Sequence, residues 1–240
     1  MESSRESRLK GILSGRLEAL EKRIEAACRR AGRNRSEITL VAVTKTISAE
    51  IAALLPSLGI LDLGESRPQE LWRKAEILPK TIRWHQVGHL QRNKIATTLP
   101  LAHLIHSVDS ARLLSGLESE AAKQKCKVNV LLEVNVSGET SKHGFKPDEI
   151  PGTIKLMNEL SHVEVKGLMT MAPLEKDPEA CRPAFAELRR LRDQERRELP
   201  PPHDFRHLSM GMSNDFEVAI EEGATLVRLG TVLLEGLSSL

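Results

Sequence analysis

The first strongly β-branched run of the chain is Ile38-Thr39-Leu40-Val41-Ala42-Val43-Thr44-Lys45. β-Branched side chains favour strands, so this run predicts a strand that ends in a lysine. An amine at the mouth of an apolar strand is expected to be partly desolvated, which favours its neutral, nucleophilic form. Lys45 is therefore a candidate for a Schiff base with a carbonyl compound, and the alternative is an ordinary lysine in solvent.

Two turns of small residues lie far downstream of Lys45. The first runs from Ser209 through Gly211 to Ser213, and the second is Gly230-Thr231; each follows a short apolar run. Hydroxyls and backbone N–H groups in such turns can hold an anion. A lysine for a carbonyl and two turns for a phosphate together indicate a phosphorylated aldehyde as the ligand.

Length and charge limit the classes of protein to consider. The chain has 240 residues and is 40% hydrophobic, so it can bury one large core, and we expect a single domain over residues 1–240. Two domains are possible but not required. Lys and Arg total 35 against 33 acidic residues, and a formal net charge of +2 predicts no broad attraction to nucleic acid or to a membrane.

Cysteine usage and the N-terminus bear on the compartment. Cys28, Cys126 and Cys181 are widely spaced and form no C-x-x-C, which argues against a zinc site and a disulfide framework and favours a reducing compartment. The first eight residues contain no apolar targeting region, and no segment approaches the roughly 18 apolar residues of a membrane span. We therefore expect a soluble cytoplasmic protein.

Strand-like and helix-compatible stretches alternate along the chain. Apolar residues recur near a 3.6 period in the first thirty residues, and Gly32 supplies a stop, so a helix precedes the first strand. After Lys45, Ser48 can cap a helix that runs through Leu58 and ends at Gly59. Strands are expected near 38–45, 60–63, 82–88, 102–108, 128–136, 163–170, 205–209 and 225–229.

Eight such alternations predict an α/β fold, a (β/α)8 TIM barrel with an extra N-terminal helix. A doubly wound open sheet is the alternative, weakened because no Gly-rich dinucleotide fingerprint follows any strand. In a barrel, functional groups lie at the carboxyl ends of the strands, and phosphate is commonly held after strands seven and eight. Lys45, the Ser209–Ser213 turn and Gly230-Thr231 all fall on that face.

Several motifs resemble those of a known family. They are Val43-Thr44-Lys45-Thr46, Gly64-Glu65-Ser66, Trp84 to Lys94, Ile105-His106-Ser107-Val108-Asp109, Val134 to Gly144, Gly167 to Pro173 and Leu208 to Phe216. In this order they resemble the pyridoxal phosphate homeostasis protein family, a single-domain relative of the alanine racemase N-terminal barrel. The resemblance extends from about residue 38 to residue 231.

The resemblance implies a cofactor site for pyridoxal 5'-phosphate. Lys45 matches the lysine that forms the internal aldimine, and Arg228 matches the arginine that faces the pyridine nitrogen. The positions that match the phosphate-binding turns are Ser209, Gly211, Ser213, Gly230 and Thr231. Two departures from the family's pattern leave the finer contacts open. The usual Gly-Glu-Asn-Tyr motif reads Gly64-Glu65-Ser66-Arg67 in this chain. The Phe-Gly pair that usually follows the final arginine-x-glycine is absent from the segment Thr231 to Gly236.

The implied function is to bind and buffer pyridoxal 5'-phosphate in intracellular vitamin B6 homeostasis, without substantial turnover. The implied partners are the cofactor and the apo-enzymes that depend on it. We expect a monomer or weak dimer and no metal site. A guanidinium beside the pyridine nitrogen opposes its protonation and makes the cofactor a weak carbanion stabiliser. The chain contains no tyrosine, so the two-base route of alanine racemase is closed. A racemase-like enzyme is the alternative, and a cofactor-sensing interaction protein is a third possibility.

Other polar residues on the expected functional face leave alternatives open. His85 and His89 flank a strand end, where a hydrogen-bonding role is favoured over metal ligation. His106 and Asp109 are expected to end a strand and cap the following helix. Lys142 and His143 lie in a polar loop, either facing a ligand or in solvent, and the sequence does not decide whether Lys94 or Lys142 binds a second cofactor molecule.

Overall fold

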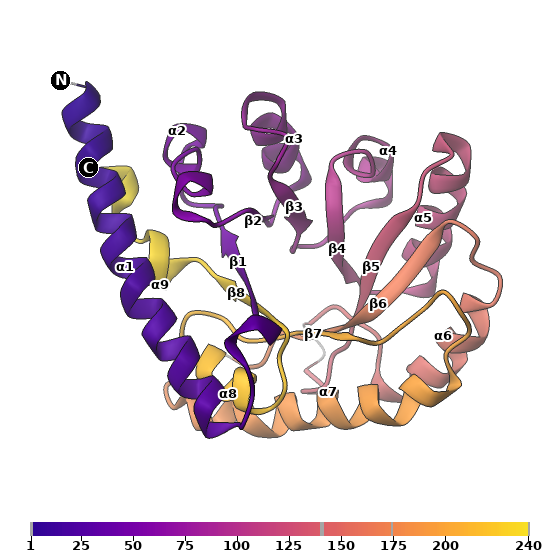
Figure 1. Ribbon diagram of the computed structural model, residues 1–240. Helices are drawn as coiled ribbons and strands as arrows, with labels where there is room; N and C mark the ends of the chain where they lie inside the picture. The colour runs from indigo at the N-terminus through magenta and orange to yellow at the C-terminus, as the bar shows by residue number, and fades with distance from the viewer. Residues whose placement is uncertain (1, 140–141, 174, 240) are drawn as a thin grey trace.

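The computed structural model describes residues 2–139, 142–173 and 175–239, and its eight parallel strands pair in chain order to form a closed barrel (Figure 1). The strands are β1 (Thr39–Val43), β2 (Asp62–Glu65), β3 (Arg83–Gln86), β4 (Ala102–Val108), β5 (Val128–Glu133), β6 (Val163–Met169), β7 (His207–Ser209) and β8 (Leu226–Leu229). The barrel closes where β8 pairs with β1, Leu226 opposite Thr39. The predicted barrel is confirmed, and the doubly wound open sheet is excluded.

The predicted strands differ from the observed ones mainly at their ends. The second strand was expected at 60–63 and runs from Asp62 to Glu65. Gly59 has a left-handed backbone with φ 84°, and the chain joins the sheet only at Asp62, which lies opposite Arg83 of β3. The fifth strand ends at Glu133 instead of residue 136, because the chain beyond it bridges to Phe145.

The helices alternate with the strands around the barrel. They are α1 (Glu2–Arg30), α2 (Ala49–Ala52), α3 (Pro68–Ile77), α4 (Ile95–Thr98), α5 (Ala111–Gln124), α6 (Ile150–Met157), α7 (Arg182–Glu195), α8 (Phe216–Glu221) and α9 (Thr231–Leu234). Ser48 caps α2 as predicted, accepting a hydrogen bond from the N–H of Ile51 at 3.4 Å. The predicted helix does not reach Leu58: a separate 3-10 turn begins at Pro56, which lacks an N–H to continue a helix. None of the helices in the described part of the chain is long and apolar enough to cross a membrane.

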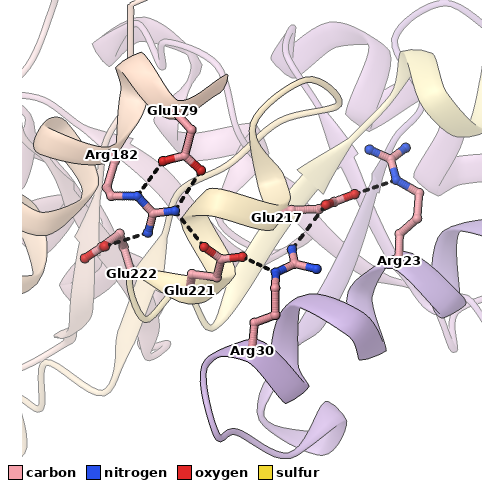
Figure 2. A network of polar contacts seen from close by, with 7 residues as sticks. All are labelled: Arg23, Arg30, Glu179, Arg182, Glu217, Glu221 and Glu222. Atoms are coloured by element: carbon pink, nitrogen blue, oxygen red, sulfur yellow. Dashed lines mark hydrogen bonds and ion pairs between the residues drawn. The ribbon is translucent and has the colours of Figure 1, made fainter. Parts of the chain in front are cut away.

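The N-terminal helix α1 is attached to the barrel by an apolar stripe and by ion pairs. Leu13, Leu20 and Ile24 are buried, and α1 packs beside α8 and α9 (Figure 1). At its end, Arg30 contacts Glu221 at 2.6 Å, and Arg182 at the start of α7 contacts the same carboxylate at 2.6 Å (Figure 2). Glu221 therefore links three helices that are distant in the sequence.

Two groups of buried side chains form the core. The larger lies between the strands and the helices, while a small apolar cluster contains Val41, Leu104, Leu131, Met169 and Leu226. A row of polar side chains is buried with them on five strands: Asp62, His85, His106, Ser209 and Arg228. This polar row runs from the amino end of the barrel to the carboxyl end, where the candidate site lies.

Candidate functional site

A cavity of about 630 Å³ opens at the carboxyl ends of the strands. Its volume is in the range of small-molecule sites. Five of the residues predicted for the cofactor site line it: Lys45, Ser213, Arg228, Gly230 and Thr231. The two other predicted residues, Ser209 and Gly211, are not in its lining.

Lys45 lies two residues beyond the end of β1 and lines the cavity. The expected partial desolvation is not observed, because Lys45 is exposed. Within the described residues its side chain makes no hydrogen bond or ion pair, so the amine is available to a ligand. The backbone beside it is firmly held: the carbonyl of Thr44 accepts from Lys74 Nζ at 2.7 Å, and Lys74 also pairs with Glu65 at 2.5 Å, with both side chains buried.

Arg228 is a buried cationic residue of the cavity, and it lies in the carboxyl half of the barrel. Its Nη1 donates to Ser209 Oγ at 2.7 Å and its Nη2 to the carbonyl of Thr170 at 2.9 Å, and the residue is only 5% exposed. Burial lowers the pKa of Arg228 to about 10, opposed by the nearby Glu133 and Asp215 carboxylates. Because that value is well above neutral pH, the guanidinium remains charged.

The two predicted phosphate turns lie side by side. The hydroxyl of Ser213 accepts a hydrogen bond from the N–H of Val232 at 3.2 Å, which joins the turn after β7 to the turn after β8. Gly211 shapes the first turn, because its φ is +92° and a Cβ there would lie 2.6 Å from that of Ala219. Gly211 therefore acts through its backbone conformation, and its carbonyl accepts from the N–H of Arg228 at 3.0 Å.

Ser209 has contacts other than the phosphate contact that was expected of it. It is fully buried, and its hydroxyl lies 2.7 Å from Arg228 Nη1 and 2.8 Å from His106 Nδ1. Strand β7 ends at Ser209, so its side chain lies within the barrel beside Arg228, whereas Ser213 lies four residues further along, in the cavity wall. The geometry gives Ser209 a role in holding Arg228.

Glu133 is a residue of the cavity that sequence reasoning missed. It ends β5 and is 4% exposed. Burial raises the pKa of Glu133 to about 7, the Asp109 carboxylate adds to this, and Arg228 and His89 oppose it. The available signal was an acidic residue within a mainly apolar strand, but that strand was expected to continue to residue 136, so Glu133 was not placed at its end. Such a group can exchange a proton near neutral pH.

Histidines and acidic groups also meet at the mouth of the cavity. His89 Nδ1 lies 2.9 Å from Asp109 Oδ2, and the rings of His89 and His143 stack at 4.8 Å. The hydrogen-bonding role expected of His89 is therefore observed, and the ligand atoms of His89, Asp109 and His143 lie within 4.8 Å of one another. His143 lines the cavity, whereas Lys142 pairs with Glu139 at 2.6 Å.

The expectation that His106 and Asp109 end a strand and cap a helix was wrong. His106 lies inside β4 and is fully buried. The residue that caps α5 is Ser110, whose side chain accepts from the N–H of Leu113 at 3.3 Å. Ser110 follows Asp109 directly, so the short sequence could not distinguish two neighbouring residues that are both good caps.

Comparison with known proteins gives a consistent result. The model of the alanine racemase N-terminal domain matches residues 16–237. A pyridoxal phosphate homeostasis protein of Aquifex aeolicus is 43% identical over 91% of this chain and 95% of its own. The chain belongs to the pyridoxal phosphate homeostasis protein family.

Solved structures of similar proteins share the fold of this family member. PipY of Synechococcus elongatus with PLP bound is 31% identical, with a TM-score of 0.79 over 92% of this chain and 99% of that one. A Bifidobacterium adolescentis protein described as unknown is 34% identical, with a TM-score of 0.88 over 95% of this chain and 96% of that one. These likenesses cover nearly the whole barrel.

The residues of this family member fit pyridoxal phosphate on structural grounds. The cavity combines a free amine at Lys45, a charged guanidinium at Arg228 and hydroxyls at Ser213 and Thr231. An aldehyde, a ring nitrogen and a phosphate are the three groups that such a set can bind. Ser66, in the position of the usual asparagine, also lines the cavity.

Proposed function

We propose that this chain binds pyridoxal 5'-phosphate in the cavity at the carboxyl end of its barrel and serves pyridoxal phosphate homeostasis without substantial turnover. The observation that carries the proposal is the convergence of Lys45, Arg228 and the two linked turns on one cavity. Membership of the family and the PLP-bound structure of PipY support it.

Each part of the site has a separate task. When bound, the cofactor supplies an aldehyde that an amine can attack and a ring that can withdraw electrons. Lys45 presents the amine, while Ser213, Gly230 and Thr231 would hold the phosphate. Arg228 would face the ring nitrogen, and its positive charge would oppose protonation there. This opposition weakens electron withdrawal by the ring and favours storage over conversion.

The absorbance spectrum of the protein mixed with pyridoxal phosphate tests the proposal. A covalent link to a lysine should give a visible band that changes on borohydride reduction, and peptide mapping should then find the pyridoxyl group on Lys45. Lys45→Ala should remove this band and retain weak, reversible binding, because the phosphate turns are a separate attachment point.

Lys142→Ala is the matched control, since Lys142 is close to the mouth and already paired with Glu139. It should keep the band. A pyridoxyl group mapped to a different lysine, with Lys45 unmodified, would contradict the assignment. Transfer of bound cofactor to an apo-enzyme would separate a carrier from a sensor, because only a carrier releases its cofactor to a recipient.

A racemase-like activity is the second candidate, and one observation favours it. Glu133 adds to the cavity a carboxyl group whose pKa is raised to about 7 by burial, a value suited to proton transfer. The chain has no tyrosine for the route used by alanine racemase. Any exchange of an amino acid's α-hydrogen should therefore be slow and should depend on Glu133.

Incubation with L-alanine in deuterated water distinguishes the two functions. We expect trace deuterium incorporation, less D-alanine, and a further loss of both in Glu133→Gln. Turnover on the order of 1 per second or faster would be ordinary for an enzyme and would reject the storage function.

A further inference from the structure

A continuous chain of hydrogen bonds crosses the barrel from the cavity to the opposite end. Arg228 Nη1 lies 2.7 Å from Ser209 Oγ, which lies 2.8 Å from His106 Nδ1. His106 Nε2 lies 2.8 Å from His85 Nδ1, and His85 Nε2 lies 3.0 Å from Asp62 Oδ1. Asp62 is at the start of β2 and lines a separate polar pocket at the amino end of the barrel.

All five side chains of this polar chain are removed from solvent. Ser209 and His106 are 0% exposed, His85 is 2% exposed, Arg228 is 5% exposed and Asp62 is 7% exposed. Buried polar atoms need partners, because an unmade hydrogen bond is costly in a protein interior. Each member therefore depends on its neighbours in the chain.

The charged ends of the chain, Arg228 and Asp62, determine which group donates and which accepts in each hydrogen bond. A guanidinium only donates and a carboxylate only accepts. Burial alone would raise the pKa of Asp62, but hydrogen bonds from Arg83 and His85 outweigh it and hold the pKa below its usual range, so Asp62 is ionised. Burial lowers the pKa of His106 well below its ordinary value, and the charge of Arg228 adds to this, so His106 is neutral.

With a neutral His85, only one arrangement of protons satisfies these conditions. His85 donates from Nε2 to Asp62 and accepts at Nδ1 from His106 Nε2. His106 then accepts at Nδ1 from the Ser209 hydroxyl, which leaves the lone pairs of Ser209 facing Arg228. The reverse order would place an imidazole lone pair against the carboxylate of Asp62. The tautomers of both histidines are thus set at the far end of the barrel.

We propose that Asp62 is a positioning residue for the cofactor site, acting through His85, His106 and Ser209 to hold Arg228 toward the ring of the ligand. Ser209 and the carbonyl of Thr170 together fix the plane of the guanidinium. The inference rests on the proposed function for its effect on the cofactor, whereas the order of the protons is a property of the protein alone.

Nitrogen NMR of ¹⁵N-histidine protein without ligand tests the proton order. His85 and His106, assigned from His85→Gln and His106→Gln spectra, should both carry their proton on Nε2. In Asp62→Asn, an amide that can donate as well as accept should populate the Nδ1–H form of His106. Glu21→Gln is the matched control, because Glu21 lines the same far pocket but pairs with Arg35 at 2.7 Å. It should leave both tautomers unchanged.

Titration with pyridoxal phosphate tests the effect on the cavity. The Asp62→Asn protein should bind pyridoxal phosphate about threefold to tenfold more weakly, because one hydrogen bond that positions Arg228 is misplaced. The absorbance band of its bound cofactor should also be shifted. Glu21→Gln should bind as the unmodified protein does. Should Asp62→Asn fail to fold, Ser209→Ala breaks the chain beside Arg228 without removing a buried charge and should weaken binding similarly.

The outcomes separate this inference from the proposed function. An Nδ1–H tautomer of His106 in the unmodified protein, or variants that bind with unchanged affinity and spectrum, would overturn the positioning role. Failure of the unmodified protein to bind the cofactor would instead overturn the proposed function, and the tautomers would still report the proton order.

Discussion

Glu133 is a buried carboxyl group in the wall of the cavity, and its environment makes it costly to ionise. Burial and the nearby Asp109 raise the pKa of Glu133 to about 7, from 4.5 in an unfolded chain. Below pH 4.5 it is protonated in both states and has no effect on stability. Between pH 4.5 and pH 7 this carboxyl group ionises in the unfolded chain but not in the folded protein, so the free energy of unfolding decreases. Above pH 7 the group is ionised in both states, and the lost stability is not regained.

Glu133→Gln should therefore stabilise the protein more at high pH than at low pH. We expect the gain in free energy of unfolding to be about 2 kcal/mol larger at pH 8 than at pH 5, measured by urea denaturation. The reason is that glutamine removes a carboxylate that is forced to ionise in an apolar wall. An equal gain at both values would show that Glu133 is not strongly desolvated.

Glu118→Gln is a control with the opposite expectation. Burial would raise the pKa of Glu118, but hydrogen bonds from His162 and from the backbone N–H groups of Ser161, His162 and Val163 lower it. A lowered pKa contributes stability that is present above pH 4.5 and lost in acid. Glu118→Gln should thus destabilise the protein by a similar amount at pH 5 and pH 8.

Among the elements, α1 depends most on tertiary packing. Its sequence carries charged residues on most of its surface, and a single buried stripe that includes Leu20 and Ile24 faces the barrel. The ion pairs at its C-terminal end are partly exposed: the side chain of Arg30 is 50% exposed and that of Glu221 is 18% exposed. Exposed pairs contribute little, about 0–1 kcal/mol each, so the apolar stripe holds the helix.

Leu20→Ala should consequently destabilise the protein by about 2–5 kcal/mol, the usual effect of removing a buried leucine side chain. Leu20 is 1% exposed. Lys10→Ala, an exposed change on the same helix, should alter stability by less than about 0.5 kcal/mol. Thermal or urea denaturation measures both. A loss for Leu20→Ala no greater than that of the control would mean that α1 detaches without unfolding the barrel.

For the whole molecule, acid stability should be governed by histidines that are kept neutral. Burial lowers the pKa of His106 and His203, and it lowers that of His207 to about 4. In the unfolded chain these residues titrate near 6.5, so the unfolded state takes up protons first as the pH falls. The stability that they contribute is complete above pH 6.5 and declines below it.

In the Glu133→Gln background, which removes the opposing carboxyl group, the free energy of unfolding should fall between pH 6.5 and pH 5. Each of these histidines contributes up to about 1.4 kcal/mol per pH unit. Denaturation with urea at a series of pH values measures the slope. A free energy that stays constant or rises over this interval would show that the buried histidines accept protons without unfolding.

The barrel and a candidate site at the carboxyl ends of its strands could both be predicted from the amino-acid sequence. β-Branched runs and helix-compatible stretches alternate eight times, and this topology brings the carboxyl ends of all strands together. Lys45, Ser213, Gly230 and Thr231 follow strands, so their common cavity could be predicted from local pattern, whereas Arg228 lies inside β8 and was expected only from the resemblance to the family. The ends of strands and helices were less certain, because they depend on which neighbours pair.

The organisation of the barrel interior could not be predicted in this way, because it depends on the folded chain. Whether a side chain points into the barrel depends on the pleat and the stagger of its strand, which short apolar runs do not specify. His106 and Ser209 are 103 positions apart in the sequence, yet their side chains share a hydrogen bond. The high pKa of Glu133, the exposure of Lys45 and the contacts of Ser209 all arise from such distant neighbours, because burial and hydrogen bonding are properties of the folded chain.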